Sequence, residues 1–410
     1  MGIEKRVYSL IFWVQDLLTN INESNLEEIL EEIKKSELIT TETGVEILCT
    51  EISIIPHIRP TSKEIISELC GRLVLNLEGN QMFIMSLLKI LGFRAPIILR
   101  RLYDKGIINT ENSLCCLVDY HGFICFMPEI MNLRPILWNK CAKLCSERLM
   151  ADNWYLFKEL IRFGWEKNSL GYVLKYDLID DLIIMMGNPK FSIDTTIEWS
   201  DFEVPFFNNK MFPLSIAAIY DSVKCFKQLM MIGSRIPNDI VKSAIIGGNC
   251  DLVRASMIIA NNNHGLISIA SVYRRAIIVS WLKENCFSSE LNLVENAYFN
   301  NIRQIIHSLD HQCDCSHNNE EHIICLHVAA KNGYYYLLKT LLEKGFDINI
   351  KDQFGMTPIH YACLNGQFRV ARFLIKNGAN IHEPNELNIF FVMVYFYIWG
   401  TIHSFICSIG

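Results

Sequence analysis

The densest group of side chains that could do chemistry lies between positions 311 and 327. It contains four histidines and three cysteines, namely His311, Cys313, Cys315, His317, His322, Cys325 and His327. Imidazole and thiolate groups are the ligands that zinc prefers, and a structural zinc site needs four of them around the ion. The order Cys-x-Cys-x-His followed by His322 matches no standard zinc module. We therefore predict an ordinary loop without a metal ion, with a zinc site as the alternative.

The usual catalytic motifs are missing from the sequence. It has no nucleophile elbow, phosphate-binding loop, pair of zinc-helix histidines or dinucleotide-binding glycines. Gly247 and Gly248 lack the lysine of a phosphate loop and fit the end of a helix better. Asp180 and Asp181 are typical of a solvated helix face. The sequence therefore predicts a protein that is not an enzyme and uses no cofactor, and no motif supports the alternative of an enzyme in residues 1–150.

The elements that would position these side chains follow a repeat of 33 residues between Glu321 and His382. Five pairs carry it: His327 and His360, Asn332 and Asn365, Gly333 and Gly366, Leu341 and Leu374, and Gly345 and Gly378. A repeat of this length is typical of a solenoid built from pairs of helices. Because each repeat buries its apolar face only against a neighbour, two repeats cannot fold alone and more are expected.

The second copy of the repeat contains the signals of two helices. Thr357 can cap a helix N-terminus, and Pro358 follows at the first helical position, where its missing N–H costs nothing. Ala362 is small, as two closely packed antiparallel helices require. Gly366 and Gly378 fall where each helix must end, and glycine adopts the left-handed conformation needed there without steric cost.

These residues resemble the ankyrin-repeat family. The resemblance implies a stacked α-solenoid that binds proteins, and it makes His327 and His360 the histidines that hydrogen-bond within the hairpin. Cys325 then aligns with Pro358, so two of the possible zinc ligands have structural roles. A helical region followed by degenerate and then regular repeats is also similar to the multi-repeat ankyrin proteins of parasitic protists.

Weaker copies extend the array toward the N-terminus. Pro213 and Gly233 are separated by the same 20-residue interval as Pro358 and Gly378, with Ser215 at the place of the family histidine. An alanine precedes each expected helix end by four positions, in the pairs Ala244 and Gly248, Ala270 and Arg274, Ala297 and Asn301, and Ala329 and Gly333. Shortened repeats of 26 or 27 residues imply trimmed hairpin loops.

We expect an all-α protein with a helical N-terminal region, an ankyrin-repeat α-solenoid and short β-hairpin loops. In residues 1–150, Leu26, Ile29, Leu30 and Ile33 form an apolar helical stripe, and Ser24 with Glu27 and Thr61 with Glu64 fit helix-starting capping boxes. The expected segments are a helical region (1–150), a degenerate first repeat with an inserted loop (151–210), degenerate repeats (211–320), two regular repeats (321–384) and an apolar tail (385–410).

Composition limits the function further. Hydrophobic residues make up 50% of the chain and charged residues 20%, which suits a large core. The net charge of −6 includes no basic run, so nucleic-acid binding lacks its electrostatic footprint. Fifteen cysteines without a cleavable signal sequence predict reduced thiols and a cytoplasmic protein.

The resemblance also predicts which residues face a partner, since positions beside the frame line the concave surface of a solenoid. They are Gln353, Phe354 and Met356 in the hairpin, Tyr361, Leu364 and Asn365 in the first helix, and Val328, Lys331 and Tyr334 in the preceding repeat. Phe354, Tyr361 and Tyr334 are the strongest candidates because large aromatic side chains dominate interfaces. Packing between repeats is the alternative role. We predict a scaffold or adaptor for a protein partner.

The tail allows a second hypothesis. Residues 387–410 contain no charged side chain, and as a helix they would span about 36 Å, against a hydrocarbon core of about 30 Å. The tail could therefore anchor the protein in a membrane. The alternative, which we favour, is that it begins another repeat and packs on the last one.

Overall fold

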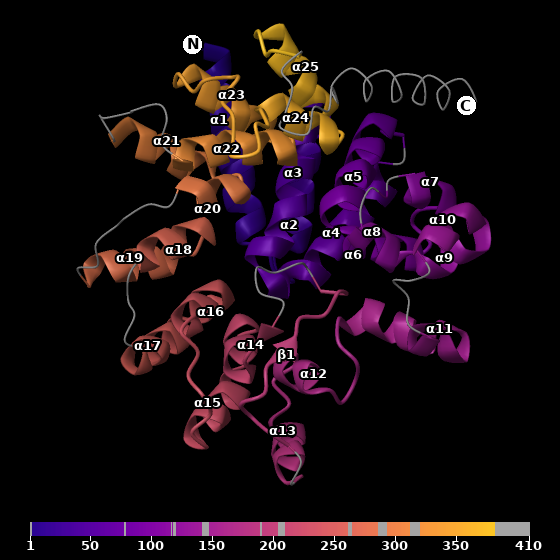
Figure 1. Ribbon diagram of the computed structural model, residues 1–410, viewed down its shortest axis with the longest axis vertical. Helices are drawn as coiled ribbons and strands as arrows, with labels where there is room; N and C mark the ends of the chain where they lie inside the picture. Colours follow the sequence, from indigo (N-terminus) through magenta and orange to yellow (C-terminus); the bar gives the residue numbers. More distant parts are fainter. Residues whose placement is uncertain are drawn as a thin grey trace. The chain divides into compact units, whose positions relative to one another are not determined.

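The chain is described by a computed structural model (Figure 1). It describes residues 2–77, 79–115, 117, 120–141, 147–188, 191–203, 210–260, 265–285, 293–311 and 320–381. These residues form α-helices and one two-stranded sheet, which confirms the all-α fold class. The chain divides into two compact units, Met1–Ser288 and Ser289–Gly410. The predicted tail lies outside the described residues.

The first unit begins with a region of packed helices. They are α1 (Gly2–Thr19), α2 (Leu26–Lys35), α3 (Glu42–Ile58), the short 3-10 helix η1 (Pro60–Ser62), α4 (Lys63–Asn76), α5 (Gln81–Arg94), α6 (Pro96–Asp104), α7 (Thr110–Cys115), α8 (Tyr120–Cys125), α9 (Met127–Leu133), α10 (Pro135–Cys141) and α11 (Glu147–Phe163). Helix α3 packs between α1 and α5, and α6 contacts α4 and α5. Their shared core includes the fully buried Leu48, Ile52, Leu69, Leu88 and Ile98.

The apolar stripe of α2 is buried as the sequence predicted, since Leu26, Ile29, Leu30 and Ile33 are the buried residues of this helix. The two capping boxes are wrong. The hydroxyl of Ser24 donates to the side chain of Asn22, and α2 begins one residue later than expected. Thr61 lies inside η1, so the residue before α4 is Ser62. In both places a local turn uses the backbone where the cap would have formed.

Four pairs of antiparallel helices complete the first unit. They are α12 (Leu170–Lys175) with α13 (Ile179–Met186), α14 (Pro213–Ile219) with α15 (Val223–Met231), α16 (Ile240–Gly247) with α17 (Cys250–Ile259), and α18 (Leu266–Val272) with α19 (Ala276–Glu284). The first helices of these pairs stack in the order α12, α14, α16, α18 (Figure 1). Between α13 and α14, β1 (Ile197–Glu198) pairs antiparallel with β2 (Lys210–Met211).

A left-handed residue follows the first helix of each pair. In the first unit these residues are Asp177, Asp221, Gly248 and Arg274, with φ of 53°, 58°, 93° and 52°. The last three lie four residues after Ala217, Ala244 and Ala270, at the spacing read from the sequence. In this conformation the chain turns directly into the second helix, but residues other than glycine are strained in it.

The turn of each pair contacts the start of the second helix in the next pair. Both carboxylate oxygens of Asp177 accept backbone N–H groups at the start of α15, from Lys224 at 3.2 Å and Cys225 at 2.8 Å. The carboxylate of Asp221 accepts a hydrogen bond from the side chain of Asn249, which caps α17. These contacts join successive helix pairs on the side of their turns.

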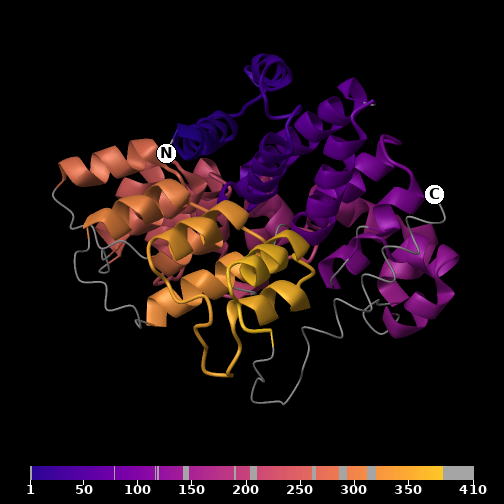
Figure 2. The same ribbon diagram turned by 90° about the horizontal axis from the view of Figure 1, so that it is seen from above.

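The described residues of the second unit form three more helix pairs. They are α20 (Leu293–Tyr298) with α21 (Ile302–His311), α22 (Glu320–Asn332) with α23 (Tyr335–Glu343), and α24 (Pro358–Leu364) with α25 (Phe368–Lys376). The first helices again stack, in the order α20, α22, α24, and α23 contacts α25 (Figure 2). The left-handed turn residues are Asn300, Gly333 and Gly366. In α20 the turn therefore comes one residue before Asn301, the position that the alanine spacing predicted.

Candidate protein-binding surface

The candidate surface is built on the frame of the two regular repeats. Thr357 precedes α24 and forms a capping box with His360, whose Nδ1 accepts the Thr357 N–H at 3.1 Å. Pro358 occupies the first position of the helix. The glycines that end the helices are all left-handed, with φ of 68° at Gly333, 92° at Gly345, 65° at Gly366 and 92° at Gly378.

The loop before α24 forms a projecting turn, residues 352–356, which we call the finger. The carboxylate oxygen Oδ1 of Asp352 accepts the backbone N–H groups of Phe354 and Met356, both at 2.9 Å. The other oxygen accepts the hydroxyl of Tyr361 at 2.7 Å. Burial and this contact raise the pKa of Tyr361 to about 12. One carboxylate thus fixes the finger and ties it to α24.

The finger is also held by the repeat before it. Nε2 of His327 on α22 lies 2.9 Å from the carbonyl oxygen of Met356, and its Nδ1 lies 2.6 Å from that of Ile323. The ring of His327 contacts the ring of Tyr361 edge to face, with centroids 5.2 Å apart. The histidine therefore connects one repeat to the finger of the next.

The side chains on this frame differ in exposure. Phe354 is 57% exposed and Leu364 is 40% exposed, and the polar Gln353 and Lys331 are also exposed. Met356, Tyr361 and Asn365 are half-buried. One exposed residue of α22, Ile324 at 41%, was not singled out from the sequence, because its counterpart 33 residues later is Thr357, which is fully buried.

Two of the nine predicted contact residues are buried. Val328 is 4% exposed and Tyr334 is 5% exposed, and the hydroxyl of Tyr334 donates to the carbonyl oxygen of Tyr298 at 2.8 Å. Tyr334 thus contacts the preceding helix pair, and both side chains are buried. They do not present a free surface to a partner.

The described part of the chain shows no cluster of possible metal ligands. Among the described residues, no group of three His, Cys, Asp or Glu side chains could hold a metal ion. The segment 312–319, with Cys313, Cys315 and His317, lies outside them. His327 and Cys325 belong to α22, and Cys325 is buried.

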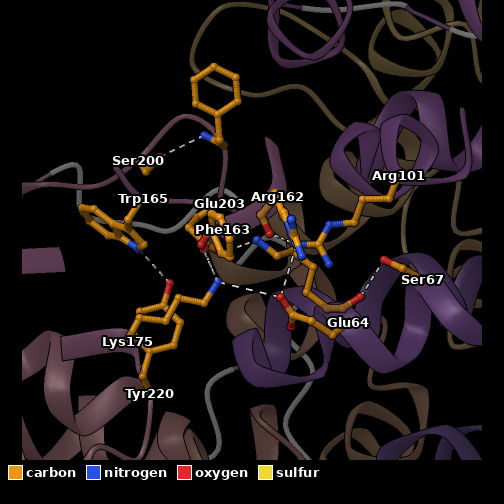
Figure 3. Close-up of polar contacts among 12 residues, drawn as sticks. Glu64, Ser67, Arg101, Arg162, Phe163, Trp165, Lys175, Ser200, Glu203 and Tyr220 are labelled. Atoms are coloured by element: carbon orange, nitrogen blue, oxygen red, sulfur yellow. Dashed lines mark hydrogen bonds and ion pairs between the residues drawn. The ribbon is translucent and has the colours of Figure 1, made fainter. Parts of the chain in front are cut away.

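A buried polar cluster lies in the first unit around Glu203 (Figure 3). Lys63 of α4 and Lys175 of α12 lie 2.8 and 2.6 Å from the carboxylate of Glu203. The exposed fractions of the side chains are 0% for Lys63, 7% for Lys175 and 1% for Glu203. Burial alone would raise the pKa of Glu203, but the two lysines outweigh burial and lower it.

Neighbouring groups extend this cluster. Nη2 of Arg101 on α6 donates to Glu64 at 3.2 Å and to the carbonyl oxygen of Arg162 at 2.9 Å. The indole N–H of Trp165 donates to the hydroxyl of Tyr220 on the other side of Lys175, as Figure 3 shows. The cluster connects the N-terminal helices to the first helix pairs. Its charged groups are held by one another, so we assign it a structural role.

Comparison with known proteins assigns the repeats. The family described as "Ankyrin repeats (3 copies)" matches residues 293–385, the segment that contains the three helix pairs of the second unit. Mouse protein phosphatase 1 regulatory subunit 12A is 42% identical over 62 residues, which are 15% of this chain and 6% of the relative. Human protein phosphatase 1 regulatory subunit 27 is 38% identical over 64 residues, 16% of this chain and 42% of the relative.

A third relative has a different name. The ADP-ribosylation factor GTPase-activating protein AGD4 of Arabidopsis thaliana is 43% identical over 66 residues, 16% of this chain and 8% of the relative. The chain therefore covers less than half the length of each of these relatives. Residues 293–385 match the ankyrin-repeat family, as the repeated residues indicated.

Proposed function

We propose that this chain is a non-enzymatic scaffold or adaptor that binds a protein partner through the finger and the first helices of its regular repeats. The observation that carries the proposal is the position of Phe354, a large apolar side chain 57% exposed on a turn fixed by Asp352. An exposed aromatic residue on a rigid frame offers contact area at little entropic cost. Because the turn is already fixed, binding there would restrict few additional side chains and would lose little conformational entropy.

The surroundings of Phe354 suit a mixed interface. Leu364 and Ile324 add exposed apolar area, while Gln353 and Lys331 add polar groups. Interfaces commonly combine an apolar centre with a polar rim. We therefore expect a partner that inserts an apolar side chain beside the finger.

The comparisons support protein binding without naming the partner. The relatives share these repeats but are named as phosphatase regulatory subunits and a GTPase-activating protein. Each match is confined to a short part of the relative, so its own partner or activity does not carry over. We also propose a cytoplasmic location, to which the free thiols of the buried Cys49, Cys70 and Cys363 are suited.

The proposal is tested by Phe354→Ala combined with Leu364→Ala. We expect the double variant to stay folded and to lose at least one partner detected by quantitative proximity labelling with the wild type. The matched control is Ile375→Ala on α25, which removes an apolar side chain 39% exposed outside the finger and first helices. A folded double variant that keeps every wild-type partner would contradict the assigned surface.

The second candidate is a membrane-tethered adaptor held by residues 387–410. Within the described residues no helix is long and apolar enough to span a membrane, and the tail is not among them. If the tail inserts, Val394→Lys should sharply reduce recovery in carbonate-washed membranes, because a charge at a helix centre costs about 2.5–3.5 kcal/mol on insertion scales. A full-length chain recovered only in the soluble fraction would exclude the tether.

A further inference from the structure

Three arginines of the first unit gather where the end of α3 meets the turn between α18 and α19. Nη2 of Arg59 donates to the carbonyl oxygen of Arg274 at 3.1 Å. Nη1 of Arg274 lies 2.8 Å from a carboxylate oxygen of the buried Glu51 on α3. Nη2 of Arg275 donates to the carbonyl oxygen of Ile246 near the end of α16. Arg59 and Arg275 thus donate to carbonyl groups and, within the described residues, form no ion pair.

The charge of these two guanidinium groups is poorly balanced. Burial, and after it repulsion by Arg59, lowers the pKa of Arg275 to about 9. Burial, followed by repulsion from Arg274, lowers the pKa of Arg59 to about 10. Asp221 attracts Arg275, but burial raises the pKa of Asp221 itself. Among the described residues this corner therefore carries an excess of positive charge.

Both arginines also keep an unused hydrogen-bond donor. The Nε–H groups of Arg59 and Arg275 are buried and have no acceptor within the described part of the chain. Gly248 allows Arg275 to lie across the backbone, since a Cβ there would be 2.6 Å from Cζ of Arg275. A buried donor without an acceptor costs free energy, so such donors usually have a partner. The planar guanidinium group is well matched to phosphate and carboxylate oxygens.

We propose that Arg59 and Arg275 form a binding site for a phosphate-type oxyanion, which accepts hydrogen bonds from both guanidinium groups. Such an anion offsets the excess of positive charge that the described residues leave in this corner. Both arginines are half-buried, so solvent reaches part of each. A free phosphate compound and a phosphorylated side chain carry the same group. The site is separate from the finger and does not depend on the proposed function.

The test uses the full chain and inorganic phosphate. Calorimetric titration and thermal unfolding are measured in phosphate and in chloride at equal ionic strength. We expect phosphate to bind the wild type and to raise its Tm above the chloride value. Arg59→Gln and Arg275→Gln should each weaken binding about tenfold, the loss expected for one charge-assisted hydrogen bond. The control Arg254→Gln removes an exposed arginine that pairs with Asp251, and should bind like the wild type.

Two results would overturn the site. They are a wild type that responds equally to phosphate and chloride, and two folded variants that bind phosphate as the wild type does. Either result would leave the arginines as caps of the ends of α16 and α18. If Arg275→Gln does not fold, Arg59→Gln decides, because it leaves the contact with Ile246 in place. A phosphoserine peptide that binds more tightly than phosphate would support a phosphorylated side chain, and weaker binding a free anion.

Discussion

The helix pairs of the first unit and the regular repeats of the second form the same junction with different side chains. In the second unit the turn residue Gly333 leaves room for a long neighbour, and a Cβ there would collide with the side chain of Gln367. In the first unit the turn residue Asp221 meets the shorter Asn249 and accepts its hydrogen bond at 2.7 Å. A small turn residue is thus combined with a large neighbour, and a larger turn residue with a smaller one.

The same contrast holds for the histidine position. In the second unit His327 reaches the carbonyl oxygen of Met356 in the next finger. In the first unit Ser215 occupies this position, and its hydroxyl donates to the carboxylate of Asp239 before the next helix at 3.1 Å. Side chains that depart from the regular pattern therefore still connect successive repeats, although with different chemistry.

The first unit adds contacts that a regular repeat does not make. Arg274 adopts a left-handed backbone conformation, which is strained for arginine, and its guanidinium forms an ion pair with Glu51 on α3. Lys63 of α4 likewise pairs with Glu203. The helix pairs of the first unit are thus joined to the N-terminal helices by buried charge, whereas the regular repeats of the second unit carry the exposed finger. The following changes test this contrast, from the largest expected effect to the smallest.

The largest effect is expected from Glu203→Gln. This change leaves Lys63 and Lys175 buried without their shared counter-charge, and breaking a buried ion pair costs about 3–5 kcal/mol. Urea denaturation of the full chain measures the loss. Glu198→Gln, which removes the exposed partner of Lys210, is the control and should have almost no effect. A loss below about 1 kcal/mol for Glu203→Gln would show that buried charge does not stabilise the first unit.

A smaller loss is expected in the second unit from Gly366→Val. Gly366 has φ of 65°, a conformation that strains a β-branched residue by roughly 1–3 kcal/mol. A Cβ there would touch only the ring of Phe368, at 3.8 Å, so backbone strain dominates the result. Thermal unfolding followed by circular dichroism checks it. An unchanged midpoint would mean that the regular repeats tolerate side chains at their turns as the helix pairs of the first unit do.

The smallest effect concerns the finger at high pH. The pKa of Tyr361 is raised to about 12 in the folded chain, above the value of about 10 for an unfolded tyrosine. The folded state then binds more protons between these values, so its stability falls as the pH rises from about 10 to 12. Asp352→Asn should bring the titration of Tyr361 closer to normal. Ultraviolet titration of both proteins measures the shift, and identical curves would contradict a link between the finger and α24.

Sequence reasoning predicted the repeat because local residue types dictate it. Thr357, Pro358 and Gly366 each fix a backbone conformation within their own turn, so spacing alone located them. The turn at Arg274 was located by the same spacing, although arginine does not favour it. The turn after α20 was missed by one residue, at Asn300, because Asn296 stands four residues before it, where most other pairs have alanine.

The candidate surface was less predictable because exposure depends on neighbouring repeats. Val328 and Tyr334 were predicted to face a partner for the same reason as Lys331, yet both are buried. Tyr361 was expected to contact a partner, but its hydroxyl serves the finger through Asp352. The pairing of Lys63 with Glu203 joins positions 140 residues apart, and no local pattern reports such a contact.

The matched sizes at the turns limit how this array can change over evolutionary time. When a repeat is duplicated or deleted, a different turn residue comes to lie against the start of the second helix in the next pair. Suppose that a duplication or deletion separated Gly248 from Arg275. If a shorter side chain then took the place of Arg275, the space above Gly248 would be left unfilled. A duplication or deletion that keeps each turn residue together with the residue before the second helix of the next pair preserves the junctions on both sides. Gain or loss of repeats should therefore occur in segments whose ends respect these pairs.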